Sequence, residues 1–381
     1  MHNKIIKKLC SLVLICSLGL SACSKKDKDK EESVANSKAD IYSKIVLISD
    51  KNDININDNI KDYEKEIKKY KEENKDIKFD IENIIIDSNT IGKENFNKII
   101  NDNKIKSVIF VDNKYDVKEI ARSIKEKRRD ILTISSGIED KEEVLSKTFD
   151  LNFNVSYDNY FKNGVQTIKS YGIDRFIYLS SDSNNDGSIK KAIEENCKKI
   201  ELPFEDIKID TANDKVDMQA NLVYKINYLL DKYSNNIAIY PSDSNMNEVL
   251  LSMVTNEKFF IAGFSNYNIT KEAVDLYGIR NLSIHTNSYN ILNAKISNFY
   301  KDNETNSKVY ARPTSNEYCL VRYPSELSIA MSTKQKPLRV AYNREYLEEV
   351  ANVRSNLSLA IDRVNDKYKN NYIIKFDNIV Y

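Results

Sequence analysis

Residues 151–181 read LNFNVSYDNYFKNGVQTIKSYGIDRFIYLSS, and this stretch decides the fold class. Two short runs rich in β-branched and aromatic residues, 151–155 and 175–179, predict strands. The amphipathic segment between them, which extends to about residue 171, predicts a helix. A strand, a helix and a second strand in this order are typical of a parallel sheet.

The same alternation continues on both sides of this stretch. Toward the N-terminus we predict strands at 44–48, 81–86, 107–111 and 131–134, with helices near 59–73, 93–102, 115–128 and 140–147. Toward the C-terminus we predict helices near 188–200, 215–232 and 245–256, with strands at 207–209, 237–240, 259–262 and 282–284. The pattern predicts an α/β protein with two Rossmann-like three-layer lobes, each built on a parallel sheet and joined to the other by a hinge.

The C-terminal part is less regular. It predicts a helix at 289–300, a long helix at 343–367 and a strand at 372–376. The apolar stripe of the long helix consists of Leu347, Val350, Leu357, Ile361 and Val364. Docking of this stripe on the first lobe is the plain interpretation, and a dimer seam is the alternative. We therefore expect a first lobe of residues 41–155 plus about 289–381, and a second lobe of residues 156–288.

Composition excludes several classes of function. The chain of 381 residues has 58 Lys+Arg against 57 Asp+Glu, so it lacks the basic footprint of a nucleic-acid-binding protein. Its 8 glycines form no phosphate-cradling motif, and its only histidines are His2 and His285. We therefore expect no enzyme, no cofactor and no nucleic-acid partner. A hydrolase built on carboxylates such as Asp50 and Asp182 remains an open alternative.

The N-terminus has the features of a targeting segment. A basic start precedes a short apolar stretch, residues 9–20, which is typical of a signal peptide and too short to span a bilayer. The stretch ends in Leu20-Ser21-Ala22-Cys23, which resembles the bacterial lipobox. We predict that residues 1–22 are removed and that Cys23 carries a diacylglyceryl anchor on the extracytoplasmic face of the cell membrane. Residues 23–40 are polar and mixed in charge, and they predict a flexible tether.

Two cysteines follow the tether, Cys197 and Cys319, so we expect no disulfide framework. Cys197 continues the apolar series of Ile189 and Ile193 at helical spacing. This spacing indicates a core position rather than a reactive thiol.

The order of lipobox, tether, lobe, lobe and return resembles the type I periplasmic-binding-protein superfamily, whose members close two Rossmann-like lobes on a small solute. Residues 151–164 and 171–181 are similar to the crossover into the second lobe of that superfamily. Together with Asn196-Cys197 and residues 241–248, PSDSNMNE, they are similar to an uncharacterised branch of bacterial lipoproteins with a domain of unknown function. The resemblance covers roughly residues 41–305.

The resemblance implies a solute-binding lipoprotein that closes on a small polar ligand and is presented to an ABC permease. The alternative is a ligand-sensing or structural envelope lipoprotein without a transport role. Under either interpretation, the loops after the strands line the cleft. The ligand-binding candidates are Ser49, Asp50, Asp112, Asn113, Ser135, Ser136, Asp182, Ser242, Asp243, Asn245 and Phe264. Ser, Asp and Asn are also favoured helix N-caps, so each polar candidate has a structural alternative.

Two further features have a functional and a structural interpretation. Asp182, Asn184 and Asp186 match the early positions of a calcium loop, but Ile193 stands where the loop needs an acid, so the calcium candidate is weak. Three arginines have the chemistry to clamp a carboxylate or phosphate, and ion pairs are the alternative. They are Arg175, Arg312 and Arg322.

Overall fold

A computed structural model describes most of the chain after the expected tether. The described residues are 42–73, 78–155, 160–181, 187–210, 215–233, 236–263, 270, 272–273, 276–279, 289–302, 309–312, 314–354, 359–376 and 379–381. The expected signal peptide, the lipid-anchor residue Cys23 and the tether lie outside them, as does the strand expected at 282–284.

The first sheet has seven strands in the order β11-β12-β5-β4-β3-β1-β2. The strands are β1 (Ser43–Asp50), β2 (Phe79–Ile86), β3 (Ile105–Val111), β4 (Leu132–Ser136), β5 (Leu151–Val155), β11 (Leu359–Arg363) and β12 (Asn371–Phe376). All neighbours pair in parallel except β11 and β12, which are antiparallel. The central strands read as nearly continuous apolar runs because helices bury both faces of the sheet.

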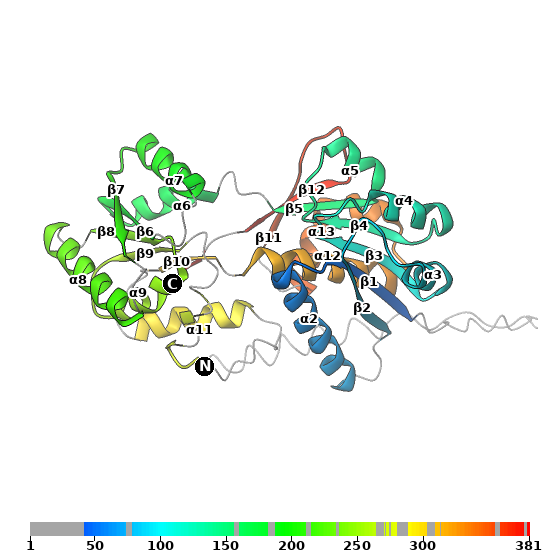
Figure 1. Cartoon of the computed structure of the whole chain (residues 1–381), viewed down its shortest axis with the longest axis horizontal. Coiled ribbons are helices and arrows are strands. Elements are labelled where there is room, and N and C mark those ends of the chain that lie inside the picture. The colour runs from blue at the N-terminus through cyan, green and yellow to red at the C-terminus, as the bar shows by residue number, and fades with distance from the viewer. Residues whose placement is uncertain are drawn as a thin grey trace, which may run out of the picture. The chain divides into compact units, whose positions relative to one another are not determined.

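Two helical layers cover the first sheet (Figure 1). One layer contains α2 (Ile54–Glu73), α12 (Asn316–Thr333) and α13 (Arg344–Glu349), with the 3₁₀-helix η2 (Leu338–Tyr342). The other layer contains α3 (Lys93–Asn101), α4 (Lys118–Lys127) and α5 (Glu142–Thr148). The sequence of α2 explains how a helix packs in such a layer. Ile56, Ile60 and Ile67 recur at helical spacing and lie in the core.

The second sheet has six strands in the order β13-β10-β9-β8-β6-β7. The strands are β6 (Arg175–Ser181), β7 (Phe204–Ile209), β8 (Ile237–Pro241), β9 (Phe260–Gly263), β10 (Val309–Ala311) and β13 (Ile379–Val380). Only β13 is antiparallel to its neighbour, β10. On one face lie α6 (Tyr160–Ser170) and α7 (Gly187–Lys199); on the other lie α8 (Lys215–Tyr233), α9 (Asn247–Val254) and α11 (Tyr289–Asp302).

The expected fold class is confirmed, because each sheet is a doubly wound α/β layer with helices on both faces. Cys197 is a free cysteine buried in the core of the second sheet, as predicted. Burial raises the pKa of its thiol to about 12, so the thiol stays protonated at neutral pH.

The C-terminal return differs from the expected boundary. Residues 289–381 were expected to rejoin the first lobe as one piece. Instead α11, β10 and β13 belong with the second sheet, while α12, β11 and β12 belong with the first. The chain therefore passes between the sheets three times: from β5 to α6, from β10 to α12 and from β12 to β13.

The prediction of a long helix at 343–367 is wrong. Helix α13 ends at Glu349 and continues only as a π-helical turn, Val350–Arg354, and β11 begins at Leu359. The cause is tertiary: Leu359 and Ile361 are buried on alternate positions, and the backbone of β11 pairs with β12. The expected docking on the first lobe still holds for Leu347 and Val350, which lie in its core.

Candidate functional site at the strand ends of both sheets

Both sheets contain the same strand pattern. The first includes the order β2-β1-β3-β4-β5, and the second includes β7-β6-β8-β9-β10. In the first sheet, the chain leaves β1 toward one edge, where β2 lies, and leaves β3 toward the other edge, where β4 lies. In the second sheet, the connections from β6 to β7 and from β8 to β9 diverge in the same way. The carboxyl ends of these strand pairs are topological switch points, where open α/β sheets bind ligands. The candidate site therefore consists of two half-sites, one at each switch point (Figure 1).

Ser49 and Asp50 end β1 in the first half-site. Ser49 is fully buried, and its Oγ donates a 2.7 Å hydrogen bond to Asn57 Oδ1. Asn57 Nδ2 in turn donates to the backbone oxygen of Asp50, at 2.7 Å. The Asp50 carboxylate accepts from the backbone N–H of Asn52, at 2.8 Å. These bonds fix the turn from β1 into α2, so Ser49 positions the half-site from inside the lobe.

Asp53 caps α2, because its Oδ1 accepts from the backbone N–H of Ile56 at 2.9 Å. Its carboxyl group lies close to that of Asp112, which follows β3, and contributes to the raised pKa of the Asp112 carboxyl. Asp53 was not among the expected site residues, since it begins a helix instead of ending a strand. Its Asx cap was visible in the sequence, but its contact with Asp112 depends on the neighbouring positions of β1 and β3.

Asp112 stands in an unusual position. Its φ of 40° is left-handed, and its backbone N–H donates to the backbone oxygen of Ser136 at 2.7 Å. Burial, and after it the neighbouring carboxyl group of Asp53, raises the pKa of the Asp112 carboxyl to about 6. Near this pH the Asp112 carboxyl is partly protonated, so it can both donate to and accept from a polar ligand.

Asn113 ties the two strands of the switch point together. Its Nδ2 donates to the backbone oxygen of Ile48 at 2.7 Å, and the residue is only 6% exposed. Among the described residues, its Oδ1 has no hydrogen-bond partner. A buried amide oxygen in this state is a strong acceptor for an N–H or O–H group of a ligand.

Ser135 and Ser136 have structural partners at the end of β4. Ser135 Oγ donates to Asn152 Oδ1 at 2.6 Å, and Ser136 Oγ donates to the backbone oxygen of Leu320 at 2.7 Å. Both residues are buried. Their hydroxyls therefore stabilise the packing of β4 on β5 and α12, and the structural alternative describes them better than the ligand-binding one.

The second half-site is built on β6 and β8. Ser181 Oγ donates to Asp243 Oδ2 at 3.2 Å, and Asp243 Oδ1 accepts from the backbone N–H of Asn245 at 2.9 Å. Asp243 is 7% exposed and caps the 3₁₀-helix η1 (Ser244–Met246). Ser242 follows β8 directly, and Asn245 is exposed. The structure thus brings Ser181, at the end of β6, into direct contact with Asp243.

Some expected residues lie outside the described part of the chain. They are Asp182, Asn184, Asp186 and Phe264. The weak calcium candidate and the carboxylate pair of Asp50 and Asp182 therefore stay predictions. Among the described residues, no group of three or more His, Cys, Asp or Glu side chains is arranged to hold a metal ion. Across the same residues, no helix has the length and apolar character needed to cross a membrane.

The three candidate arginines have partners within the protein. Arg322 is 3% exposed and forms a double hydrogen bond to the Glu66 carboxylate, at 2.6 and 3.0 Å. Arg175 lies 4.2 Å from the ring centroid of Tyr233, and Arg312 donates to Asn316 Oδ1 at 2.6 Å. The ion-pair interpretation therefore holds for Arg175, whose Nη1 lies 3.7 Å from Glu205 Oε2, and for Arg322, although the pair of Arg322 is buried and not on the surface.

Two doubly wound lobes with polar groups at both switch points define the class of protein as a two-lobe, doubly wound α/β protein. Within it, the chain belongs to the family described as "Protein of unknown function (DUF3798)", whose sequence profile matches residues 48–309. No curated protein sequence matches the chain.

Solved structures show what the chain is similar to. The crystal structure of a proposed transcriptional regulator from Clostridium difficile 630 has a TM-score of 0.69 at 21% identity, and covers 89% of this chain and 99% of that chain. A sugar ABC transporter protein from Actinomyces odontolyticus has a TM-score of 0.43 at 11% identity, and the match covers 77% of this chain and 84% of that chain. A branched-chain amino acid ABC transporter ligand-binding protein from Burkholderia xenovorans has a TM-score of 0.41 at 11% identity, and the match covers 89% of this chain and 95% of that chain. The first of these likenesses shows that the fold is shared.

Proposed function

We propose that this protein is a membrane-anchored extracytoplasmic lipoprotein that closes its two lobes on a small polar solute for an ABC importer. The observation that carries the proposal is the presence of buried or half-buried polar side chains at the switch points of both sheets. These side chains are Asp50, Asp53, Asp112 and Asn113 in the first lobe, with Ser181 and Asp243 in the second. The proposed role is binding without chemical turnover.

The first half-site supports a ligand with hydrogen-bond donors. The Asp53 and Asp112 carboxyl groups and the Asn113 Oδ1 atom offer acceptors, and the Asp112 carboxyl offers a donor when it is protonated. A ligand with hydroxyl or amino groups satisfies this set. The three passages of the chain between the sheets supply the hinge about which such lobes close.

The anchoring part of the proposal depends on the N-terminal sequence. The basic start, the apolar stretch and Leu20-Ser21-Ala22-Cys23 support lipidation at Cys23. Two acyl chains hold a protein at a membrane stably, whereas a single chain binds reversibly. Mass spectrometry of the membrane fraction, with and without Cys23→Ala, tests this part alone.

A thermal-shift panel tests the binding part. The folded unit begins at Ile41, so residues 41–381 are heated with sugars, amino acids, nucleosides, peptides, glycosides or calcium. Selective binding raises the melting temperature by mass action, and we expect this with one class of solute. Asp243→Ala, which removes a half-site acceptor, should abolish the rise, whereas Asp58→Ala on the exposed face of α2 should preserve it.

A folded protein with no shift for any solute contradicts the binding proposal. It favours the alternative, a structural envelope lipoprotein. A ligand sensor is favoured if binding occurs but deletion of the gene leaves uptake of the radiolabelled solute unchanged. The likeness to the Clostridium difficile protein, described as a proposed regulator, makes the sensor role worth this separate test.

A further inference from the structure

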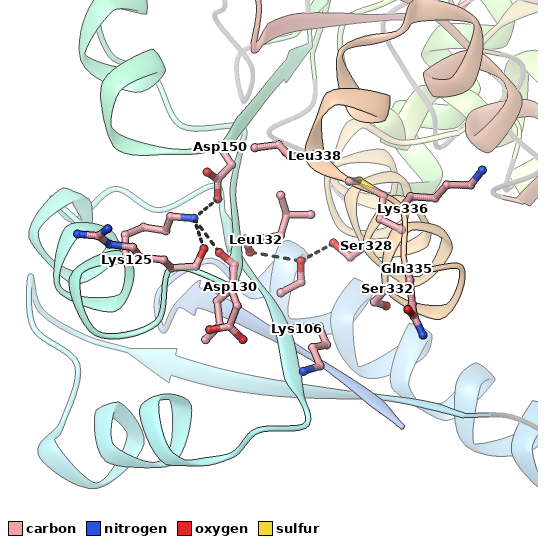
Figure 2. A pocket seen from close by; sticks show the side chains of 14 residues that line it. Lys106, Lys125, Asp130, Leu132, Asp150, Ser328, Ser332, Gln335, Lys336 and Leu338 are labelled. Carbon is pink, nitrogen blue, oxygen red and sulfur yellow. Dashed lines mark hydrogen bonds and ion pairs between the residues drawn. The ribbon is translucent and has the colours of Figure 1, made fainter. Parts of the chain in front are cut away.

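A cavity lies at the amino-terminal edge of the first sheet, where its strands begin. The half-site lies at the opposite edge, where the strands end. It has a volume of about 560 Å³ and opens at the amino ends of β3 and β4, where Ser107 pairs with Leu132. The C-terminal ends of α4 and α12 complete its walls (Figure 2). The half-site lies at the carboxyl ends of the same strands, so the two sites are separate.

The floor of the cavity combines hydroxyl groups with an apolar wall. Ser107 Oγ lies 2.9 Å from Ser328 Oγ on α12. Leu132, Met331 and Leu338 line the recess beside these hydroxyls. Hydroxyls next to aliphatic side chains suit a polar headgroup that carries a short apolar stem.

The rim of the cavity has an excess of positive charge. Four of its lining residues are basic, Lys106, Lys125, Arg129 and Lys336, and two are acidic, Asp130 and Asp150. Both acids already have basic partners: Arg128 binds Asp130 through two 2.8 Å hydrogen bonds, and Lys125 binds Asp150 at 2.8 Å.

The remaining cations that line the cavity are Lys106, Arg129 and Lys336. Figure 2 shows Lys106 and Lys336 on different sides of the recess, so they do not converge on one point. The exposed residues Lys104, Lys334 and Arg339 lie on the neighbouring turns of the chain. Dispersed cations suit a surface that carries many negative charges better than a single small anion.

The N-terminal segment joins the folded unit at this same edge. Strand β1 begins at Ser43, and Lys44 pairs with Ile105, the residue before Lys106. In the proposed lipid-anchored protein, the chain between Cys23 and residue 40 is short enough to keep this edge within about 25 Å of the bilayer on average. A tether of this kind leaves the orientation of the lobe free, so surface charge decides which face meets the membrane.

We propose that this basic edge, with its cavity, is a membrane-facing surface that binds anionic phospholipid headgroups. The inference rests on the lipid-anchored location in the proposed function, and it adds a second membrane contact to the acyl chains. A basic patch next to a lipid anchor strengthens attachment and orients the attached domain.

Vesicle flotation tests the proposal with residues 41–381, which lack the anchor. We expect the protein to float with phosphatidylcholine vesicles that contain phosphatidylglycerol and not with phosphatidylcholine alone, and we expect salt to weaken the association. The triple variant Lys106→Gln, Arg129→Gln, Lys336→Gln should lower the partition coefficient about a hundredfold. The matched variant Lys191→Gln, Lys198→Gln, Lys199→Gln removes three exposed cations from α7 and should bind like the wild type.

The proposal is overturned by no binding to the anionic vesicles, by equal binding to both vesicle types, or by an equal loss in the two triple variants. A thermal shift with inorganic phosphate in a protein that ignores vesicles also overturns it, since it identifies a site for a free anion. The solute panel is an independent readout. A flat panel with intact vesicle binding contradicts the proposed solute function alone, whereas a solute-dependent shift without vesicle binding contradicts only this inference.

Discussion

Asp112 has an environment that its neighbours in the sequence do not suggest. It follows a buried strand, adopts a left-handed φ of 40° and faces the carboxyl group of Asp53. Asn and Asp tolerate this backbone region better than most residues, because their short polar side chains hydrogen-bond locally. The residue thus combines a strained backbone with a carboxyl group that is partly neutral near pH 6.

Asp112→Asn tests this environment through the pH dependence of stability. The folded pKa of about 6 lies above the ordinary value of 3.8, so the stability that this carboxyl contributes is present below pH 3.8 and is lost as the pH rises through 6. Because the side chain is partly exposed, we expect the loss to be about 1 kcal/mol. The variant should therefore gain stability relative to the wild type between pH 4 and pH 7 in urea unfolding. Asp58→Asn, whose side chain is 61% exposed, is the control, and an Asp112 variant that follows the wild-type profile contradicts the prediction.

At the scale of elements, a buried polar network joins α2 to α12. Arg322 and Glu66 are 4% and 13% exposed in their side chains, and Tyr63 donates to Glu326 Oε1 at 2.7 Å. Burial lowers the pKa of the Arg322 guanidinium, but Tyr318 and the hydrogen bond to Glu66 outweigh it and leave the pKa above its ordinary value. The network fixes α2, which follows the first strand, against α12, which comes from the C-terminal part of the chain, in the core of the first sheet.

Glu66→Gln should expose the cost of a buried, unpaired charge. Removing one partner of such a pair costs about 3 to 5 kcal/mol, whereas replacing both by apolar residues is often neutral. We therefore expect Glu66→Gln to lower the free energy of unfolding by this amount, and Glu66→Leu combined with Arg322→Met to recover most of it. Lys61→Gln, which breaks an exposed pair with Asp58, should cost less than about 1 kcal/mol. A Glu66 variant no less stable than the Lys61 variant in chemical denaturation contradicts the buried-pair argument.

At the scale of the whole molecule, the last residues of the chain belong to the second sheet. Tyr381 is 3% exposed in the core of that sheet, and its backbone N–H donates to Val309 at 2.8 Å. The strand that precedes it, β13, pairs with β10. The second lobe is therefore completed by residues that follow the last strand of the first sheet. The chain passes through the first lobe before the second sheet has its last strand.

Tyr381→Ala should destabilise the second lobe selectively. Removing a buried aromatic side chain costs about 3 to 5 kcal/mol. We expect amide hydrogen exchange to accelerate in β9 and β10, while β3 and β4 of the first sheet keep their protection. Tyr224→Ala, at a side chain that is 73% exposed, is the control and should change neither sheet. Equal acceleration in both sheets contradicts the assignment of Tyr381 to the second lobe.

The sequence by itself determined the strands of both sheets through residue 263, the α/β class and the core position of Cys197, because these depend on local apolar periodicity. It also placed Asp50, Asp112 and Asp243 at strand ends, which is a local property. Only the tertiary structure decided that Asp53 meets Asp112, that Ser135 and Ser136 bond within the lobe, and that 359–363 is a strand. It also decided that β10 and β13 complete the second sheet. Strand pairing and side-chain partners join residues far apart in the chain, and no local pattern records which distant residue supplies the other half of a hydrogen bond.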